Sequence, residues 1–515
     1  MLWRRLTIKL GFLFGAGAEF DYDMPSGGQF ALDIFREDPS SSKSEFKSMR
    51  ASIDKQTKYA CKFLPNDFDT KNINSFGKTV YENIIKDTIE HNRMLIIDNI
   101  NNIDGLARGI VDDINKRYSD FDQAIKNLTG KQITNINMGQ TIKFSRELAK
   151  GNELFCSEYF SALLYVYKTV DFAIPAHKRS LGKIILSIIQ LQLGALSEQL
   201  VRKINDNPFE KKDDDIDLFD DLGDILHLNY SGSGLIGLEY LLDKEKVNPI
   251  SSDETMVLYF AQCLLKKIFA VVLDYKSLID ANWHYLYCPS AEWSKFCKIS
   301  IFLLTVKNYI DKQCSKADKN KKGYYDELKD YINENKIVVT KVATTNYTEL
   351  ISHKLETDVV YLNGSTNMWY DPYLNEIGTK EYLEKNEKHF MVPLLFTQSG
   401  TKPMTAIQMN KEYMEVYNSF FNSEYICSIG FGFNQDDEHI NGIIRYLVKQ
   451  NKKLIVVKNK NNKTEVDEAK AIAEKLKILD YDKIKVILVD KDRMVDGKLW
   501  IDELINRFSK ADYEN

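Results

Sequence analysis

Four loops in this chain contain the glycine, amide and hydroxyl residues from which phosphate-binding sites are built. Each follows a short apolar run: Gly15-Ala16-Gly17, Thr344-Thr345-Asn346, Asn363-Gly364-Ser365 and Gly430-Phe431-Gly432-Phe433. A single glycine at the end of a strand is usually only a turn. Ligands of parallel sheets, however, bind outside the carboxyl ends of the strands, where loops present backbone N–H groups to phosphate. Four such loops therefore predict one binding site.

Short apolar runs rich in β-branched residues indicate the strands that position these loops. Residues 10–17 are typical of a buried strand that runs into a glycine turn, and further strands are expected at 336–343, 358–362, 425–429, 453–457 and 485–489. Helical patterns lie between several of them, and residues 28–36 also look helical. The fold class we expect is α/β, with a Rossmann-like parallel sheet made from residues 1–35 and 335–515.

Residues 36–334 have a different pattern. Helical periodicity runs through residues 81–97, 159–170, 183–204, 255–278 and 299–314, and charge-rich linkers lie at 210–221 and 316–322. We expect a large, mostly α-helical insertion that splits the sheet domain and serves regulation or oligomerisation.

The composition limits the partners. The chain has 515 residues, and its 69 Lys+Arg against 74 Asp+Glu give a formal charge of −5, so we expect no direct nucleic-acid binding. Seven cysteines without a CxxC pair favour reduced thiols and a cytoplasmic location. The 25 glycines and 10 prolines are few, which disfavours a turn-rich all-β fold. No uncharged apolar run reaches the roughly 18 residues of a membrane span, and no membrane association is expected.

The four loops, taken in order, resemble the motifs of the sirtuin superfamily in its divergent bacterial members. The Gly15–Gly17 loop with Pro25 is similar to the sirtuin phosphate loop, and Thr344-Thr-Asn-Tyr-Thr348 resembles the motif Thr-x-Asn-x-Asp. Leu362-Asn-Gly-Ser365 resembles Leu-His-Gly-Ser. Residues 430–440, which include Asp437 and His439, resemble the ending of sirtuin-like proteins from bacterial antiphage systems, the class of the Thoeris effector.

The resemblance implies that NAD is the substrate. The Gly15–Gly17 loop would then approach the pyrophosphate, Asn346 would reach the nicotinamide ribose, and Asn459 would lie on the adenosine side. By position in the motifs, the implied NAD contacts are Gly15, Ala16, Gly17, Glu19, Asp21, Pro25, Thr345, Gly364, Gly430, Phe431, Asp437 and Asn459.

Several positions depart from the sirtuin pattern. The catalytic histidine falls on Asn363, which cannot act as a general base. Thr348 stands where the motif has aspartate, Glu19 stands where it has serine, and the four-cysteine zinc ribbon is missing. Protein deacetylation is therefore disfavoured. Hydrolysis of NAD needs another group to handle the water, and the candidates are His439, Asp21 and Asp23; a structural hydrogen bond is the alternative role for His439.

Three other patterns are weaker. Residues 232–237 fit GxGxxG but have no βαβ unit around them, so a plain loop is expected. His284, Cys288 and Cys297 do not have the spacing of a zinc finger and are expected to pack in a core. The acidic run at 213–221 lacks the glycine and glutamate of a calcium loop, which predicts a solvated loop. We expect no metal.

The resemblance thus implies an NAD hydrolase that releases ADP-ribose and nicotinamide and depletes NAD in bacterial antiphage defence. Its catalytic residues would be Asn346, Asn363 and His439, and it would act as a homo-oligomer or with a companion sensor protein. Two alternatives stay open. Because Asn363 replaces the histidine, the chain could be an inactive nucleotide-binding or scaffold subunit of a defence complex; the other alternative is an ADP-ribosyltransferase.

Overall fold

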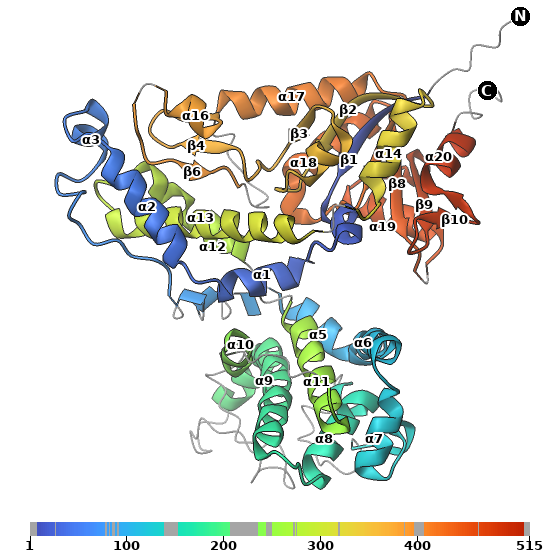
Figure 1. The fold of residues 1–515 in the computed structure, drawn as a ribbon. Coiled ribbons are helices and arrows are strands. Elements are labelled where there is room, and N and C mark those ends of the chain that lie inside the picture. Colours follow the sequence, from blue (N-terminus) through green and yellow to red (C-terminus); the bar gives the residue numbers. More distant parts are fainter. Residues whose placement is uncertain are drawn as a thin grey trace, which may run out of the picture. The chain divides into compact units, whose positions relative to one another are not determined.

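The chain divides into two compact units (Figure 1). The computed structural model describes all residues except 1–7, 26, 78–79, 82, 85–87, 90–91, 139–152, 207–234, 244–249, 271–272, 274, 318–319, 386, 396–405, 462 and 509–515. The first unit, here called the sheet unit, comprises Met1–Ser26, Glu37–Phe76 and Lys276–Asn515. The second, the helical unit, comprises Gly27–Arg36 and Gly77–Tyr275. The acidic run at 213–221 and positions 232–234 of the GxGxxG pattern lie outside the described residues.

A six-stranded parallel sheet forms the centre of the sheet unit. Its strands are β1 (Lys9–Phe14), β2 (Val338–Thr344), β3 (Val359–Tyr361), β7 (Tyr425–Ile429), β8 (Lys453–Asn459) and β9 (Ile484–Val489). They lie in the order β3-β2-β1-β7-β8-β9, and every neighbouring pair is parallel. Counted within this sheet, the third strand comes first, then the second, first, fourth, fifth and sixth, which is the doubly wound order. The predicted Rossmann-like parallel sheet is confirmed.

Helices cover both faces of this sheet because side chains alternate along each strand. Phe12 and Phe14 of β1 share a buried cluster with α14 (Tyr324–Asn333), α15 (Leu350–Leu355) and α20 (Trp500–Phe508). Gly11 points to the other face, where a Cβ would lie 2.5 Å from the ring of Phe420 on α17 (Ile407–Phe421). Two further helices, α18 (Glu438–Lys449) and α19 (Glu465–Lys475), connect β7, β8 and β9. The glycine in β1 thus lets α17 approach the sheet.

A smaller antiparallel sheet belongs to the same unit. It contains β5 (Glu376–Gly378), β4 (Trp369–Asp371) and β6 (Val392–Pro393), and α2 (Ser40–Ser52), α3 (Lys58–Phe63), α13 (Trp293–Lys316) and α16 (Lys380–Leu383) lie in the same unit. Phe46 of α2 stacks on Phe390 with 4.6 Å between ring centroids, and Trp293 of α13 packs edge-on to the same ring. Residues 37–76 and 276–334, which were expected in the insertion, therefore pack with the sheet. A short hairpin, β10 (Met494–Val495) and β11 (Lys498–Leu499), follows β9.

The helical unit contains α1 (Gly27–Arg36), α5 (Arg93–Asn101), α6 (Ile103–Arg117), α7 (Phe121–Thr129), α8 (Glu158–Thr169), α9 (Pro175–Asp206), α10 (Leu235–Leu242) and α11 (Asp253–Phe269). The predicted helices at 159–170 and 183–204 are confirmed, and so is 299–314 as α13. The single helix expected at 255–278 is wrong, because α11 ends at Phe269 and α12 (Tyr275–Asn282) begins separately. Helix α1 was expected with the sheet, but it packs here: Arg36 Nε donates to Leu241 O at 2.5 Å.

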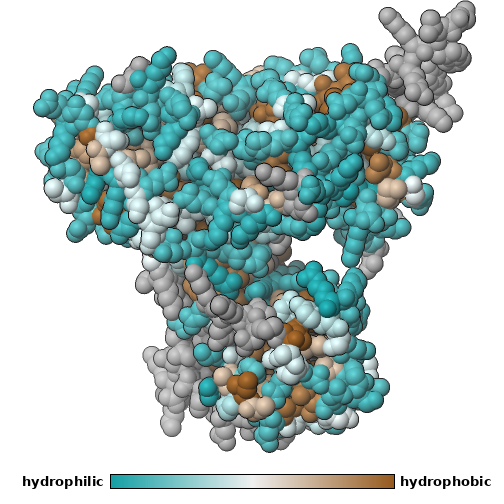
Figure 2. Space-filling view, in the orientation of Figure 1, coloured by the Kyte–Doolittle hydropathy of each residue, from teal (hydrophilic) through white to brown (hydrophobic). Residues whose placement is uncertain are grey.

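In the part of the chain that the structure describes, no helix combines the length and apolar character needed to cross a membrane. Figure 2 shows a face that is mostly hydrophilic over the sheet unit, with several hydrophobic residues grouped on the helical unit.

Candidate functional site

The predicted loops lie at one edge of the parallel sheet. They follow the carboxyl ends of β1, β2, β3 and β7, which are four adjacent strands in the order β3-β2-β1-β7. The order in which the strands are added reverses between β1 and β7, and a crevice at such a switch point is where doubly wound sheets bind ligands. The strand order therefore places the four loops side by side at one edge of the sheet, as the sequence predicts.

Glycines bring the β1 loop and the β7 loop into backbone contact. Gly15 N donates to Ile429 O at 2.9 Å, and Gly17 N donates to Gly430 O at 3.0 Å. A Cβ on Gly15 would lie 2.7 Å from Gly430 O, and a Cβ on Gly430, whose φ is +70°, would lie 2.2 Å from Ala18 N. The glycines therefore build the crevice. The N–H groups of Gly15 and Gly17 are already bonded to protein, and Ala16 is exposed in the same turn.

Asn346 is held from three sides at the end of β2. Its backbone N–H donates to Thr344 Oγ1 at 3.1 Å, and its Nδ2 donates to Gly15 O at 3.2 Å and to the hydroxyl of Tyr325 at 3.3 Å. The side chain is buried, with 7% of the residue exposed. Because both Nδ2 protons are committed, Oδ1 is the atom through which this amide can accept from a ribose hydroxyl or a water.

Glu19 lies beside Asn346 in a buried polar cluster. Only 3% of Glu19 is exposed, and its Oε1 accepts from Thr348 Oγ1 at 2.5 Å and from the Tyr325 hydroxyl at 3.1 Å. Burial raises the pKa of Glu19 to about 7, although the bonds from Thr348, Tyr325 and Asn346 act in the opposite direction. A carboxyl group that gains or loses its proton near neutral pH therefore contacts the residues that hold Asn346.

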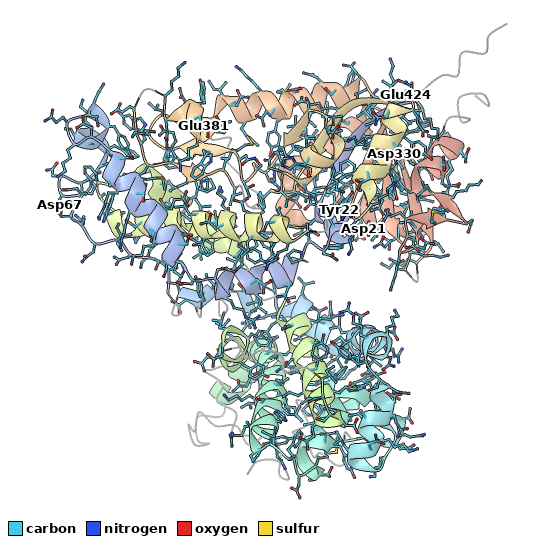
Figure 3. The ribbon with its side chains drawn as sticks, in the orientation of Figure 1. Asp21, Tyr22, Asp67, Asp330, Glu381 and Glu424 are labelled. Carbon is cyan, nitrogen blue, oxygen red and sulfur yellow. The ribbon has the colours of Figure 1, made fainter. Side chains whose placement is uncertain are left out.

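Sequence reasoning missed Tyr325. It lies on α14, in a segment that was assigned to the insertion, yet its ring packs edge-on to Phe14 at 5.1 Å and stacks on Tyr22 at 5.3 Å. Tyr22 in turn donates to Asp326 Oδ2 at 2.8 Å and so ties the short helix η1 (Ala16–Tyr22) to the start of α14; Figure 3 labels Tyr22. The available indication was position, because a helix directly before a parallel strand is expected to pack on the sheet.

Asn363 and His439 form a second contact at the same edge. Asn363 is 1% exposed, its Nδ2 donates to Thr345 O at 3.3 Å, and its Oδ1 lies 3.3 Å from His439 Nε2. This geometry assigns the proton of a neutral His439 ring to Nε2. Gly364 has a φ of +78° and packs against Leu394 O, so the turn after Asn363 requires glycine. The structure thus connects the predicted Asn363 and His439 directly, and Thr345 links them to Asn346 along the chain.

Other predicted residues lie farther along η1 or at the start of α18. Asp21, labelled in Figure 3, accepts from Arg493 at 2.8 Å, and Asp23 accepts from Lys321 Nζ at 2.6 Å. Pro25 is half-buried after η1, and the buried Asp437 directly precedes α18. Asp21 and Asp23 are therefore engaged in ion pairs that tie η1 to neighbouring segments.

A cavity of about 440 Å³ lies beside the glycine contact. Its lining combines the β1 and β7 loops with the end of β8, the following loop and α19: Gly17, Phe20, Tyr324, Gly430, Phe431, Gly432, Phe433, Asn434, Val456, Val457, Lys458, Asn459, Lys463, Glu468, Ala471, Ile472 and Lys475. Four residues predicted as NAD contacts, Gly17, Gly430, Phe431 and Asn459, line this one cavity. Its position at the switch point and its mixed apolar and polar lining suit a nucleotide.

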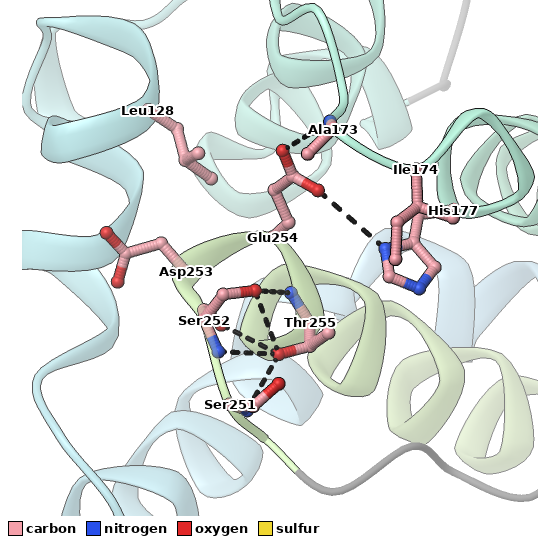
Figure 4. A pocket seen from close by; sticks show the side chains of 9 residues that line it. All are labelled: Leu128, Ala173, Ile174, His177, Ser251, Ser252, Asp253, Glu254 and Thr255. Carbon is pink, nitrogen blue, oxygen red and sulfur yellow. Dashed lines mark hydrogen bonds and ion pairs between the residues drawn. The ribbon is translucent and has the colours of Figure 1, made fainter.

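A second pocket, of about 550 Å³, lies in the helical unit (Figure 4). His177 Nδ1 lies 3.7 Å from Glu254 Oε2, and Glu254 also accepts from Ala173 N at 2.9 Å. Ser252 and Thr255 form a reciprocal capping box at the start of α11. No sequence motif predicts this pocket. The bonds between Ser252 and Thr255 are those that a helix N-terminus makes to satisfy its own backbone, whereas Glu254 bonds to a residue 81 positions away.

Neither metal ligands nor known relatives add to this picture. Within the described ranges, no group of three or more His, Cys, Asp or Glu side chains is placed to hold a metal ion. Cys288 donates its thiol to the backbone of His284 at 3.7 Å, and Cys297 is buried on α13. Comparisons with family models, with curated proteins and with solved structures give no match.

Proposed function

We propose that the chain binds NAD at the carboxyl edge of its parallel sheet and hydrolyses the bond between nicotinamide and ribose. The observation that carries this proposal is the convergence of Asn346, Asn363 and His439 beside the contact between Gly15 and Gly430. Amide and imidazole groups at the switch point of a doubly wound sheet are suited to a dinucleotide with two riboses. The sirtuin resemblance of the same residues points to the same substrate.

The proposed binding mode places the adenosine half in the cavity beside Asn459. The pyrophosphate would then lie near the β7 loop, which runs through Gly430 and Gly432 toward the N-terminus of α18. Positive partial charge at a helix N-terminus favours a phosphate there. The nicotinamide ribose would reach Asn346, whose Oδ1 is an acceptor for a hydroxyl.

The proposed reaction breaks the C1′–N1 bond, and nicotinamide leaves with the bonding electron pair as a neutral base. The ribose carbon becomes oxocarbenium-like, a water oxygen bonds to C1′, and one proton is released to solvent, so NAD and water give ADP-ribose, nicotinamide and a proton. Because the leaving group is neutral and the ribose carbon that accepts the water is cationic, the reaction depends more on positioning of the water than on a strong base. Asn363 would orient the water here, because its side-chain amide is itself held in place by His439 Nε2 and Thr345 O.

We further propose, from the resemblance, that this activity depletes NAD in antiphage defence. In that role the helical unit would be regulatory, and the chain would act as a homo-oligomer or with a companion sensor protein. The alternative is a nucleotide-binding subunit without turnover. It is favoured by Asn363 at the histidine position and by the N–H groups of Gly15 and Gly17, which are committed to protein.

Nicotinamide release separates these alternatives. The purified full chain is incubated with NAD, alone and with the product of a neighbouring gene, and nicotinamide and ADP-ribose are measured by chromatography. Equimolar release of both products is expected. Binding of NAD or ADP-ribose by calorimetry without release under either condition would leave the binding subunit as the function, and transfer of ADP-ribose to protein would identify a transferase.

A further inference from the structure

The cavity belongs to a βαβ unit whose second strand ends in an unusual way for an NAD site. Strand β7, the glycine-containing loop at Gly430 and Gly432, helix α18 and strand β8 form this unit. In dinucleotide-binding units of this kind, an acidic residue at the end of the second strand binds the 2′-hydroxyl of the adenosine ribose, and a basic residue instead accommodates a 2′-phosphate. The residues at the end of β8 therefore indicate which adenosine ribose fits.

Strand β8 ends in Lys458 and Asn459, and no acidic residue occupies these positions. Lys463 in the following loop and Lys475 at the end of α19 line the same cavity. Lys475 Nζ donates to Gly432 O at 2.9 Å, so one ammonium group lies directly against the β7 loop. Burial lowers the pKa of Lys475, and the positive charges of Lys458 and Lys463 lower it further. Three ammonium groups thus share this end of the cavity.

The carboxylate in the lining is already neutralised. Glu468 is only 2% exposed, and it accepts from Lys458 Nζ at 2.5 Å and from Asn461 Nδ2 at 2.7 Å. Burial acts to raise the pKa of Glu468, but these two bonds hold it below its ordinary value. Glu468 therefore pairs with one lysine, and the charges of Lys463 and Lys475 are left to face a ligand.

We propose that this cavity binds the adenosine end of a dinucleotide that carries a 2′-phosphate, so that the chain prefers NADP to NAD. The inference rests on the proposed function, because it assumes that the dinucleotide lies across the same crevice. A dianionic phosphate near Lys463 and Lys475 accepts charge-assisted hydrogen bonds from their ammonium groups. The bonds that a neutral ribose hydroxyl makes with the same groups are weaker.

Calorimetry on the full chain with NAD and with NADP tests this preference. We expect NADP to bind about tenfold more tightly than NAD, which is the size of one charge-assisted bond. Lys463→Gln should reduce the affinity for NADP by about threefold to tenfold more than it reduces the affinity for NAD. Lys463 is exposed, so this substitution does not disturb the core. Lys470→Gln is the matched control, because Lys470 is on α19 over the ring of Tyr481 and outside the cavity lining.

Each outcome decides the inference. A preference for NADP that Lys463→Gln removes and Lys470→Gln keeps would support it. Equal or tighter binding of NAD would overturn the 2′-phosphate subsite while the proposed function stands. An equal loss for NAD and NADP in Lys463→Gln would also overturn it, because the lysine would then act on the shared pyrophosphate. If neither dinucleotide binds, the proposed function fails together with the inference.

Discussion

The crevice of the sheet unit and the pocket of the helical unit each contain a histidine with a polar partner and lie where a helix begins. They differ in that the pocket of the helical unit also contains a local capping box. Glu19 and Thr348 are 329 positions apart, and Asn363 and His439 are 76 apart. At the start of α11, the bonds of Ser252 to Thr255 join residues three apart, and Glu254 also accepts from Ala173 N, 81 positions away.

The bonds between Ser252 and Thr255 have a local structural cause. A helix N-terminus needs a capping residue wherever it occurs, so the bonds around Thr255 follow from the start of α11 alone. No strand or helix boundary requires a buried carboxyl group at Glu19 or an amide at Asn363. Burying such groups is costly unless they are bonded, and the partners in their bonds come from three separate segments of the sheet unit. The buried polar groups of the crevice are therefore best explained by a function.

The largest expected effect is that of Asn346→Ala. Loss of the amide removes a ribose or water contact at the reacting carbon, so nicotinamide release should fall by about 1,000-fold. Circular dichroism should show an unchanged fold, since the substitution shortens one side chain. In the helical unit, Glu254→Gln keeps the acceptor for Ala173 N and should leave release unchanged. Full activity in Asn346→Ala, or equal losses in both variants, would remove the distinction between the two pockets.

The next effect is a pH dependence of stability that comes from Glu19. Its pKa is about 7 in the folded chain against an ordinary 4.5, so the folded state holds a proton that the unfolded state has lost between these values. This contribution is complete below about pH 4.5 and is lost as the pH rises through about 7, a change of about 3 kcal/mol in the free energy of unfolding. Glu19→Gln stays neutral at all pH values and should lack this loss.

Urea unfolding of both proteins from pH 4 to pH 8 measures this contribution. The difference between wild type and Glu19→Gln should grow with pH in favour of the variant. Other titrating groups are common to both proteins and cancel in that difference. Parallel profiles would mean that the pKa of Glu19 is the same in the folded and the unfolded chain, so that Glu19 is ionised in the folded chain at neutral pH.

A smaller effect is expected for His439. Its substitution by alanine removes the hydrogen bond to Asn363 Oδ1 but leaves the bond from Asn363 to Thr345 O. We expect nicotinamide release to fall by about tenfold, the size of one bond to an amide, mainly in kcat. His439→Gln can donate from the same region and should restore part of the loss. A loss as large as that of Asn346→Ala would instead make His439 a group that acts on the water.

The sequence pattern was sufficient to predict the strands and the edge of the sheet at which the loops meet. Strand β7 was predicted at its observed bounds, because its five residues are all buried and apolar or small. Since the carboxyl ends of parallel strands lie at one edge, the convergence of Asn346 and Asn363 followed from the strand pattern alone. The role of the glycines could not be predicted in this way. The contact of Gly15 with Gly430 joins two segments, and the strand pattern does not say how closely they approach each other.

Long-range aromatic packing also could not be predicted from the sequence pattern. Helical periodicity assigned residues 37–76 to the insertion, but Phe390 N donates to the hydroxyl of Tyr59 across 331 positions, and Phe46 stacks on Phe390. An amphipathic helix needs an apolar partner, and its periodicity does not say which one it has. The same limit hid Tyr325, whose partners Phe14 and Asn346 lie on β1 and at the end of β2.

The smallest effect is expected in the helical unit, from Thr255→Val. This substitution removes the acceptor for Ser251 N and Ser252 N and breaks the capping box of α11. The free energy of unfolding should fall by about 1 kcal/mol, as for other lost helix caps, while NAD binding and nicotinamide release per folded molecule stay unchanged. Thermal unfolding and calorimetry measure the two quantities on the same sample. If Thr255→Val instead weakens NAD binding at equal folded concentration, the pocket beside α11 takes part in ligand recognition, because a lost cap on its own changes only stability.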